Sequence, residues 1–239
     1  MKGRCIGKAR PVIPWKLLDT AKVPDGGIDL RLMQRGTEFS IMTGSTELMN
    51  SRLSGSEQAL ATLVCDRLRD RARARMLIGG LGMGFTLRAA LAELGSEAGV
   101  TVAELVPAVV AWGRGPMAEI FGTSLTDPRV TIHEGDVGAL IRSAKADYDA
   151  ILLDVDNGPD GLTREANDSL YDINGLAAAL RALRPGGILA VWSSGTDARF
   201  TKRLRQSGFK VEEVPVRANG RRGGARHVIW LATTPGGRT

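Results

Sequence analysis

Cysteine and histidine are scarce in this 239-residue chain, which holds two of each. Cys5 and Cys65 lie far apart and form no CxxC pair, so we expect free thiols in a reducing, cytoplasmic environment rather than a disulfide or a thiolate metal site. His133 and His227 have no neighbours at the spacing of metal ligands. The sequence therefore predicts a protein without a bound metal ion.

Long apolar runs are missing as well. No stretch approaches the roughly 18 uninterrupted apolar residues of a membrane-spanning helix. The basic N-terminus is not followed by an apolar segment, so we expect no secretory signal and no membrane association. With 43% hydrophobic and 24% charged residues, the chain has the balance of a globular protein of one large domain with a small appendage.

Aromatic residues make up only 5% of the chain and do not alternate with its basic residues, although the net charge is +6. A surface that binds nucleic acid combines basic residues with such aromatic side chains. Two basic clusters exist, at residues 67–75 and 217–226. The first is typical of a solvated helix end, and the glycine-rich second is either a solvated hairpin tip or a phosphate contact. The sequence thus disfavours nucleic acid and favours a small-molecule partner.

The N-terminal part of the chain has the alternating pattern of β-strands. Residues 27–49 predict a β-hairpin or three short strands. Ser54 and Glu57 fit a capping box, which predicts that a helix begins there. We therefore divide the chain into a small N-terminal β segment, residues 1–53, and an α/β domain, residues 54–239.

From residue 75 onward, apolar strands alternate with helices. Strands are expected at residues 76–78, 100–103, 130–132, 150–153 and 188–192, and helices at 85–94, 107–121, 137–144, 175–183 and 198–206. Strands that are apolar throughout and spaced by helices predict a parallel sheet covered on both faces. Two further strands, at residues 211–216 and 228–231, are joined by a connection too short for a parallel crossover. The prediction is a doubly wound, Rossmann-like, seven-stranded α/β fold of class I methyltransferase type, with the last two strands as an antiparallel hairpin.

A glycine loop follows the first strand of this domain. Gly80, Gly82 and Gly84 surround Leu81 and Met83, and glycines allow backbone N–H groups to approach a ligand closely. The dinucleotide fingerprint is G-x-G-x-x-G, whereas the third glycine here comes one residue early. This spacing favours S-adenosylmethionine, which has no pyrophosphate, although a simple tight turn is the alternative.

Two acidic residues complete the predicted cofactor site. Glu104 ends the second strand about 20 residues after the glycine loop, where a carboxylate accepts the ribose hydroxyls of an adenosine. Asp136 follows the third strand beside Val137, where it either accepts from the adenine amine or caps the helix at 137–144. The carboxyl ends of neighbouring strands bind ligands in open α/β sheets. The predicted cofactor-binding residues are Gly80, Leu81, Gly82, Gly84, Glu104, Asp136 and Val137.

These motifs resemble the spermidine synthase-like branch of class I S-adenosylmethionine-dependent enzymes. The resemblance runs from about residue 48 to residue 187 and rests on residues 77–80, 86–88, 100–104, 127–130, 135–136, 148–154 and 183–187. The N-terminal segment is similar to the small β-domain of that family. The resemblance implies an enzyme, a sulfonium donor and a homodimer, and it implies that Asp154 is the catalytic base or orients an amine.

The sequence departs from that family at three places. Aminopropyltransferases carry an Asp-x-x-Asp motif whose first acid deprotonates the attacking amine and whose second holds the polyamine. Here Asp154 is followed by Asn157 in place of the second acid, with Asp156 one residue early. The acid of the glycine loop is replaced by residues 81–83, and a tyrosine–histidine pair by Gly55 and Ser56. Losing a charged contact costs about 1.5–3 kcal/mol, so we favour methyl transfer to a small polar or amine-bearing metabolite.

Several alternatives remain open at this stage. Asp156, Asn157 and Tyr171 are the predicted acceptor contacts, with core packing as the alternative for Tyr171. Glu57 either reaches the site or only caps its own helix. An aminopropyltransferase that uses decarboxylated S-adenosylmethionine is the second functional prediction, and a non-catalytic S-adenosylmethionine-binding or RNA-associated module is the third.

The form of the donor follows from a further expectation. Ordinary S-adenosylmethionine carries a carboxylate that the decarboxylated compound lacks, and a carboxylate needs hydrogen-bond donors. The loop N–H groups, Arg52 and Arg88 are candidates. We therefore expect the ordinary donor to bind more tightly.

Overall fold

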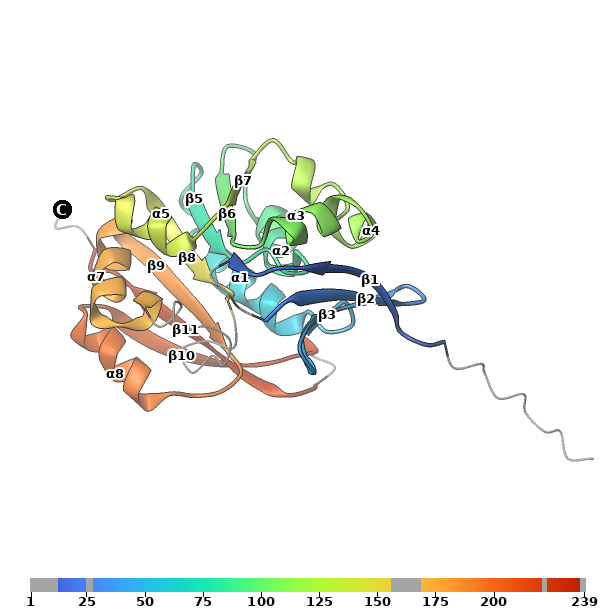
Figure 1. Cartoon of the computed structure of the whole chain (residues 1–239). Helices are drawn as coiled ribbons and strands as arrows, with labels where there is room; N and C mark the ends of the chain where they lie inside the picture. The colour runs from blue at the N-terminus through green and yellow to red at the C-terminus, as the bar shows by residue number, and fades with distance from the viewer. Residues whose placement is uncertain (1–12, 25–27, 156–168, 221–222, 237–239) are drawn as a thin grey trace, which may run out of the picture.

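Two β-sheets form the framework of the computed structural model, which describes residues 13–24, 28–155, 169–220 and 223–236 (Figure 1). The smaller sheet is N-terminal and antiparallel, in the order β1-β2-β3-β4. Its strands are β1 (Lys16–Ala21), β2 (Leu30–Arg35), β3 (Glu38–Thr43) and β4 (Thr46–Asn50). The predicted boundary at residue 53 lies between β4 and the first helix.

Strand β1 was not predicted from the sequence. Most of its side chains are exposed, and only Ala21 is buried, so the alternating apolar pattern that marks a half-buried strand is absent. Tertiary contacts hold it in place instead. It pairs with β2, and Asp19 accepts a hydrogen bond from Trp112 Nε1 at 2.7 Å, which ties the small sheet to the main domain.

The larger sheet has seven strands in the order β10-β11-β9-β8-β5-β6-β7. Five of them are parallel neighbours: β5 (Arg75–Gly79), β6 (Gly99–Glu104), β7 (Val130–Glu134), β8 (Tyr148–Leu153) and β9 (Leu183–Ser193). The last two, β10 (Lys210–Arg217) and β11 (Arg226–Thr233), form an antiparallel hairpin against β9. The predicted fold class, a doubly wound seven-stranded sheet that ends in a hairpin, is therefore confirmed.

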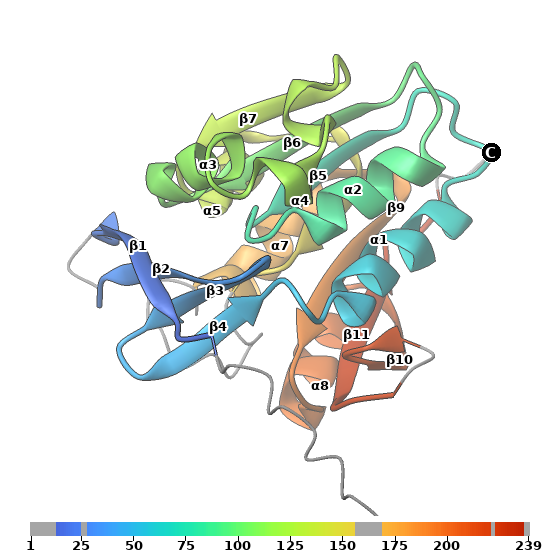
Figure 2. The ribbon, with the colours of Figure 1, turned by 90° about the vertical axis from the view of Figure 1, so that its right-hand side faces the viewer.

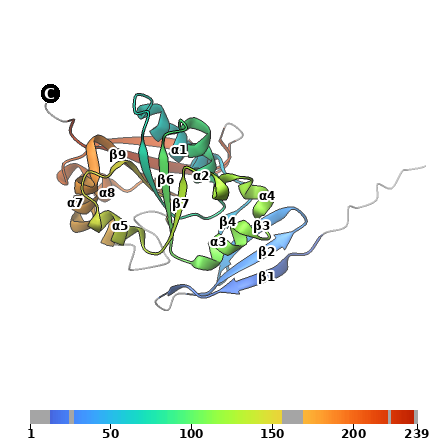
Figure 3. The ribbon, with the colours of Figure 1, turned by 90° about the horizontal axis from the view of Figure 1, so that it is seen from above.

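Helices cover both faces of this sheet, which explains why its central strands are apolar throughout. The helices are α1 (Gly55–Arg67), α2 (Phe85–Glu93), α3 (Pro107–Arg114), α4 (Ala118–Phe121), α5 (Val137–Ser143), α7 (Ile173–Ala182) and α8 (Ala198–Gln206), with a 3-10 turn at Ser124–Thr126. Side chains on β5 alternate between the two faces. Met76 packs in the core under α1, α2 and α3, whereas Leu77 packs under α5, α7 and α8. Figures 2 and 3 show these two layers.

The helix predicted at residues 107–121 is interrupted in the structure. Helix α3 ends at Arg114 and α4 begins at Ala118, because Pro116 lies between them and has no N–H for the helical ladder. The helix predicted at residues 175–183 is α7, which ends at Ala182, and strand β9 follows directly from Leu183.

No described helix has both the length and the apolar composition needed to cross a membrane. The homodimer implied by the family resemblance stays a prediction.

A buried carboxylate joins three segments at the amino ends of the strands. Asp149, on β8, is 2% exposed and accepts hydrogen bonds from the Arg71 guanidinium, from Arg184 Nη1 at 2.9 Å and from the Arg75 backbone N–H at 2.7 Å. The contact links the chain after α1, the start of β5 and the start of β9. A buried charge is stable only when it is paired in this way.

We expect Asp149→Ala to lower the free energy of unfolding by about 2–4 kcal/mol, because it leaves a partly buried N–H and two guanidinium groups without their acceptor. Urea denaturation followed by circular dichroism measures this loss. Asp147→Ala is the matched control, since Asp147 is exposed two residues earlier. Equal stability of the two variants would show that Asp149 does not hold these segments together.

Candidate active site

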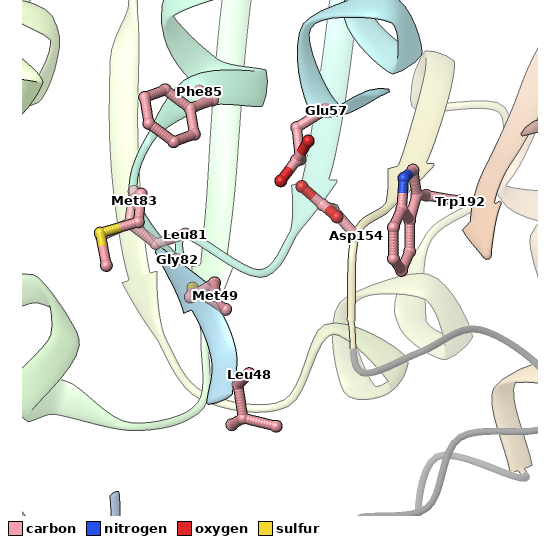
Figure 4. Close-up of a pocket in the computed structure, with 9 residues that line it drawn as sticks. All are labelled: Leu48, Met49, Glu57, Leu81, Gly82, Met83, Phe85, Asp154 and Trp192. Carbon is pink, nitrogen blue, oxygen red and sulfur yellow. The ribbon is translucent and has the colours of Figure 1, made fainter. Parts of the chain in front are cut away.

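The candidate site lies at the carboxyl ends of β5 and β8, the two strands between which the order of the parallel sheet reverses. Open α/β sheets bind ligands at such a switch point. A cavity of about 90 Å³ opens there, lined by Leu48, Met49, Glu57, Leu81, Gly82, Met83, Phe85, Asp154 and Trp192 (Figure 4). The lining comes from β4, α1, the glycine loop, α2 and the ends of β8 and β9. The N-terminal sheet therefore covers the site that the main domain builds.

The glycine loop is shaped by positions that other residues would not tolerate. Gly80, Gly82 and Gly84 have φ angles of +90°, +51° and +73°, a region that disfavours residues with a Cβ. A Cβ on Gly80 would lie 2.4 Å from the Asp154 carbonyl oxygen, and one on Gly84 would lie 2.4 Å from the Phe121 ring. Only glycine therefore fits at these positions of the loop. Without Cβ atoms, the loop backbone can approach a ligand closely.

Glu104 lies beneath the glycine loop, 8% exposed. Its carboxylate accepts hydrogen bonds from the Leu81 and Val106 backbone N–H groups, both at 2.9 Å. Burial raises the pKa of Glu104, and these N–H groups oppose that rise. The backbone N–H groups of Gly82 and Leu105 also act on this carboxylate, and the ribose contact stays a prediction. Glu104 also anchors the loop to β6, a role that the sequence analysis did not include.

Asp136 caps α5 in the structure. It accepts from the Gly138 and Ala139 backbone N–H groups at 2.8 and 3.1 Å, and it forms an ion pair with Arg142 at 2.9 Å. The capping alternative therefore describes its observed contacts, and the adenine contact stays a prediction. The Val137 side chain is 6% exposed and packs in the core beside Gly79, so this side chain does not face an open site.

Two carboxylates face each other in the pocket, Asp154 and Glu57 (Figure 4). Thr86 Oγ1 donates to Asp154 Oδ2 at 2.7 Å. Burial, and then the charge of Glu57, raise the pKa of Asp154 to about 7, while the Thr86 hydrogen bond opposes the rise. Burial also raises the pKa of Glu57. Like charges at close range disfavour double ionisation, so the pocket favours a proton or a cation between them.

The capping box predicted for Ser54 and Glu57 is wrong. Ser54 is the N-cap of α1, but its side chain accepts no backbone hydrogen bond; Gln58 Nε2 donates to it at 3.2 Å instead. Glu57 Oε2 accepts from Ser56 Oγ at 2.8 Å and lines the pocket. The spacing of a capping box identifies a helix start, but it does not say which way the acidic side chain turns.

Two further residues of the site region were missed by the sequence analysis. Trp192 lines the pocket from β9, although the pattern of residues 188–192 indicated only a buried strand. His227, on β11, packs edge-on against Trp192 with ring centroids 4.8 Å apart, and its Nδ1 lies 3.0 Å from Ser56 Oγ. Only the pairing of β9 with β11 brings these rings together.

Other predicted residues lie elsewhere. Tyr171 is 2% exposed and packs against Phe200 at 5.6 Å in the core below α7 and α8. The core-packing alternative therefore describes its observed contacts, and the acceptor contact stays a prediction. Asp156 and Asn157 lie outside the described residues. Arg52 donates hydrogen bonds to the side chains of Glu47 and Asn50, and Arg88 donates one to the Ile120 carbonyl. These two arginines do not line the pocket.

Comparisons with known proteins agree with the family resemblance. No family model matches the chain. It is 31% identical over 159 residues to the polyamine aminopropyltransferase of Mycobacterium tuberculosis, covering 63% of this chain and 29% of that relative. It is 34% identical over 116 residues to putrescine N-methyltransferase 2 of Nicotiana attenuata, covering 48% of this chain and 29% of the relative. The chain thus spans less than a third of the length of these curated relatives.

Solved structures show the same likeness in fold. The spermidine synthase of Thermotoga maritima matches with a TM-score of 0.72 at 14% identity, over 96% of this chain and 84% of that one. A probable spermidine synthase of Corynebacterium glutamicum matches with a TM-score of 0.61 at 16% identity, over 90% and 79%. The predicted resemblance to spermidine synthase-like proteins is therefore confirmed. The curated relatives include aminopropyl and methyl transferases, so they leave the transferred group undecided.

The raised pKa of Asp154 predicts how stability depends on pH. The pKa of Asp154 rises from 3.8 to about 7 on folding. The contribution of protonated Asp154 to the free energy of unfolding is therefore complete below about pH 4 and is lost as pH increases through about 7. A shift of this size corresponds to at most about 4 kcal/mol.

We therefore expect Asp154→Asn to unfold at higher urea concentration than the unchanged protein at pH 8 and at about the same concentration near pH 4. Urea titrations at the two pH values measure the difference. Asp147→Asn, an exposed change on the same segment, serves as control. If the stability of the unchanged protein and that of Asp154→Asn depended on pH in the same way, the raised pKa of Asp154 would be contradicted.

Proposed function

We propose that this chain is a transferase that moves an aminopropyl group from decarboxylated S-adenosylmethionine to an aliphatic amine. The observation that carries the proposal is the pair of facing carboxylates, Asp154 and Glu57, in a pocket beside the glycine loop. The similarity to a polyamine aminopropyltransferase supports the same reaction class.

The pocket suits an alkyl ammonium as acceptor. The two carboxylates offer a site for a positive charge. Leu48, Met49 and Phe85 offer apolar contacts for methylene groups. Trp192 adds an aromatic ring, and aromatic faces attract ammonium groups. Glu57 thereby supplies a second carboxylate in a sequence that has Asn157 where aminopropyltransferases carry their second acid.

The chemistry of the chain's own residues centres on one proton. When bound, the donor supplies a carbon already activated by positive sulfur, so the new C–N bond forms as the C–S bond breaks with its electron pair on sulfur. Asp154 accepts the proton that the acceptor ammonium must lose before its nitrogen can attack. A base with a pKa near the working pH is effective in this role, and the hydrogen bond from Thr86 holds the carboxylate in place.

The charge of the pocket bears on the form of the donor. Its described lining contains Glu57 and Asp154 but no lysine, arginine or histidine. Arg52 and Arg88, the side chains considered as partners for the donor's carboxylate, make other contacts. Because like charges repel, this arrangement favours the decarboxylated donor, in contrast to the expectation from the sequence.

Methyl transfer to an amine is the second candidate. The observation in its favour is the 34% identity to putrescine N-methyltransferase 2. Asp154 would accept the proton of the amine in the same way. Backbone N–H groups of the glycine loop would then have to hold the donor's carboxylate.

Calorimetric titration tests the donor preference. We expect decarboxylated S-adenosylmethionine to bind about 10-fold more tightly than the ordinary donor, because one close charge repulsion of about 1.4 kcal/mol is absent. Glu57→Gln should reduce this difference in affinity between the two donors. Glu104→Ala should weaken both donors by about 10-fold or more through lost charged hydrogen bonds, whereas Glu134→Ala, an exposed change on β7, should weaken neither. Equal affinities in all four proteins would contradict the predicted site.

An assay with a series of diamines and either donor tests the reaction itself. Methylthioadenosine as the thioether product indicates aminopropyl transfer, and S-adenosylhomocysteine indicates methyl transfer. We expect the first, and we expect Asp154→Asn to lower kcat by about 10²–10⁴-fold, the usual contribution of a general base. Donor binding without either product would favour the non-catalytic alternative.

A further inference from the structure

A chain of hydrogen bonds leads away from the pocket through two residues that the reaction does not otherwise use. Glu57 Oε2 accepts from Ser56 Oγ at 2.8 Å. Ser56 Oγ lies 3.0 Å from Nδ1 of His227. The serine is 1% exposed, whereas the imidazole is only half-buried. Three side chains from α1 and β11 thus connect the pocket with a partly exposed ring.

We propose that Ser56 and His227 form a proton relay that carries a proton from Glu57 out of the pocket. The need for the relay rests on the proposed function. In that function an ammonium acceptor loses one proton inside the pocket, and the bound ligands keep water out of the pocket. The relay itself rests on the hydrogen-bond chain, which exists without any ligand.

The donor order along the chain defines the relay. With Glu57 ionised, the Ser56 hydroxyl donates to Glu57, so its oxygen accepts from Nδ1–H of a neutral His227. With Glu57 protonated, the order reverses: Glu57 donates to Ser56, Ser56 donates to Nδ1, and the ring hydrogen sits on Nε2. In both arrangements Glu57, Ser56 and Nδ1 of His227 are hydrogen-bonded to one another.

One proton passes between these two arrangements. Asp154 takes it from the acceptor and gives it to Glu57, which faces it across the pocket. With Glu57 protonated, the half-buried ring exchanges its Nδ1 hydrogen with solvent for one on Nε2, which gives the second arrangement. Glu57 then gives its hydrogen to Ser56 Oγ, Ser56 gives its own to Nδ1, and Nε2 releases its hydrogen to solvent, which restores the first arrangement. One proton enters and one leaves, and His227 is neutral at the start and at the end.

The surroundings of the relay favour this behaviour. Burial lowers the pKa of His227, which keeps the ring neutral near pH 7. The edge-on contact with Trp192, at 76°, holds the ring in orientation. Asp154 faces Glu57 across the pocket, and His227 reaches it through Ser56. Two arginines on α1 and α2 make other contacts: Arg67 pairs with Glu212, and Arg88 donates to the Ile120 carbonyl.

Nuclear magnetic resonance of the ligand-free full chain tests the relay directly. The chain has two histidines, so His133→Gln assigns the ring nitrogen signals of His227 by difference. Between about pH 5 and about pH 9, we expect the hydrogen of the neutral ring to sit on Nδ1 while Glu57 is ionised and to leave Nδ1 as Glu57 is protonated. Glu57→Gln should remove this pH response.

Ser56→Ala should uncouple the two groups, so that His227 no longer responds to Glu57→Gln. Thr62→Ala is the matched control on α1, because its hydroxyl bonds only the helix backbone, and it should leave the response unchanged. A His227 titration that is the same with serine or alanine at position 56 would overturn the relay, whatever reaction the protein catalyses.

Turnover gives a second readout that a merely structural role would not produce. We expect His227→Ala to lower kcat by about 10-fold or more with little change in KM, and added imidazole to restore much of the loss. Absence of rescue, with the variant folded, would contradict proton transfer through the ring. If no donor and amine react at all, the proposed function fails, and the resonance experiment still decides whether the relay exists.

Discussion

The apposition of Asp154 and Glu57 is the constraint on which the rest of the site depends. Ionising both carboxylates in a partly apolar pocket costs free energy, because the charges lose hydration and repel each other. The protein stabilises each of them with one hydroxyl, from Thr86 and Ser56. These hydroxyls only partly offset the cost of burial, as the raised pKa of both acids shows. A pocket in this condition favours cationic ligands and groups that can share a proton.

The backbone around this pair is arranged to bring the acids together. The Asp154 N–H donates to the Gly79 carbonyl at 3.0 Å, so the end of β8 is paired with the start of the glycine loop. Gly80 passes so close to the Asp154 carbonyl that no Cβ fits. Helix α1 packs on α2 and on the β9–β11 part of the sheet, and this packing turns its first residues, including Glu57, toward β8. The acids thus meet because two separate elements end at the same place.

The departures from the aminopropyltransferase motif have a different meaning once Glu57 is placed. In sequence, Asn157 and Ser56 look like losses of a charge and of a functional pair. In the structure, Ser56 bridges Glu57 and His227, and Glu57 adds a carboxylate to the pocket from the helix side. The site therefore combines residues at the strand ends with contacts that α1 and β11 contribute.

Local sequence patterns were sufficient for the architecture of the main domain. The apolar strands, the glycine loop and the strand-end acids Glu104 and Asp154 could be placed because each depends on a few neighbouring residues and on the general rules of parallel sheets. The hairpin at the C-terminus followed from the short connection between its strands. Strand β1 could not be found, since exposed residues carry no apolar period and only pairing with β2 defines it.

The orientation of side chains was decided by tertiary structure alone. Ser54 and Glu57 have capping-box spacing, yet Glu57 turns into the pocket, where Ser56 Oγ donates to it and Asp154 faces it. For Tyr171 the sequence left an acceptor contact and core packing both open, and only the structure shows its ring against Phe200 in the core. Trp192 and His227 are 35 positions apart by their numbers and meet only through strand pairing. Spacing along a chain specifies periodicity and therefore elements, whereas the neighbours of a side chain depend on contacts between elements far apart in sequence.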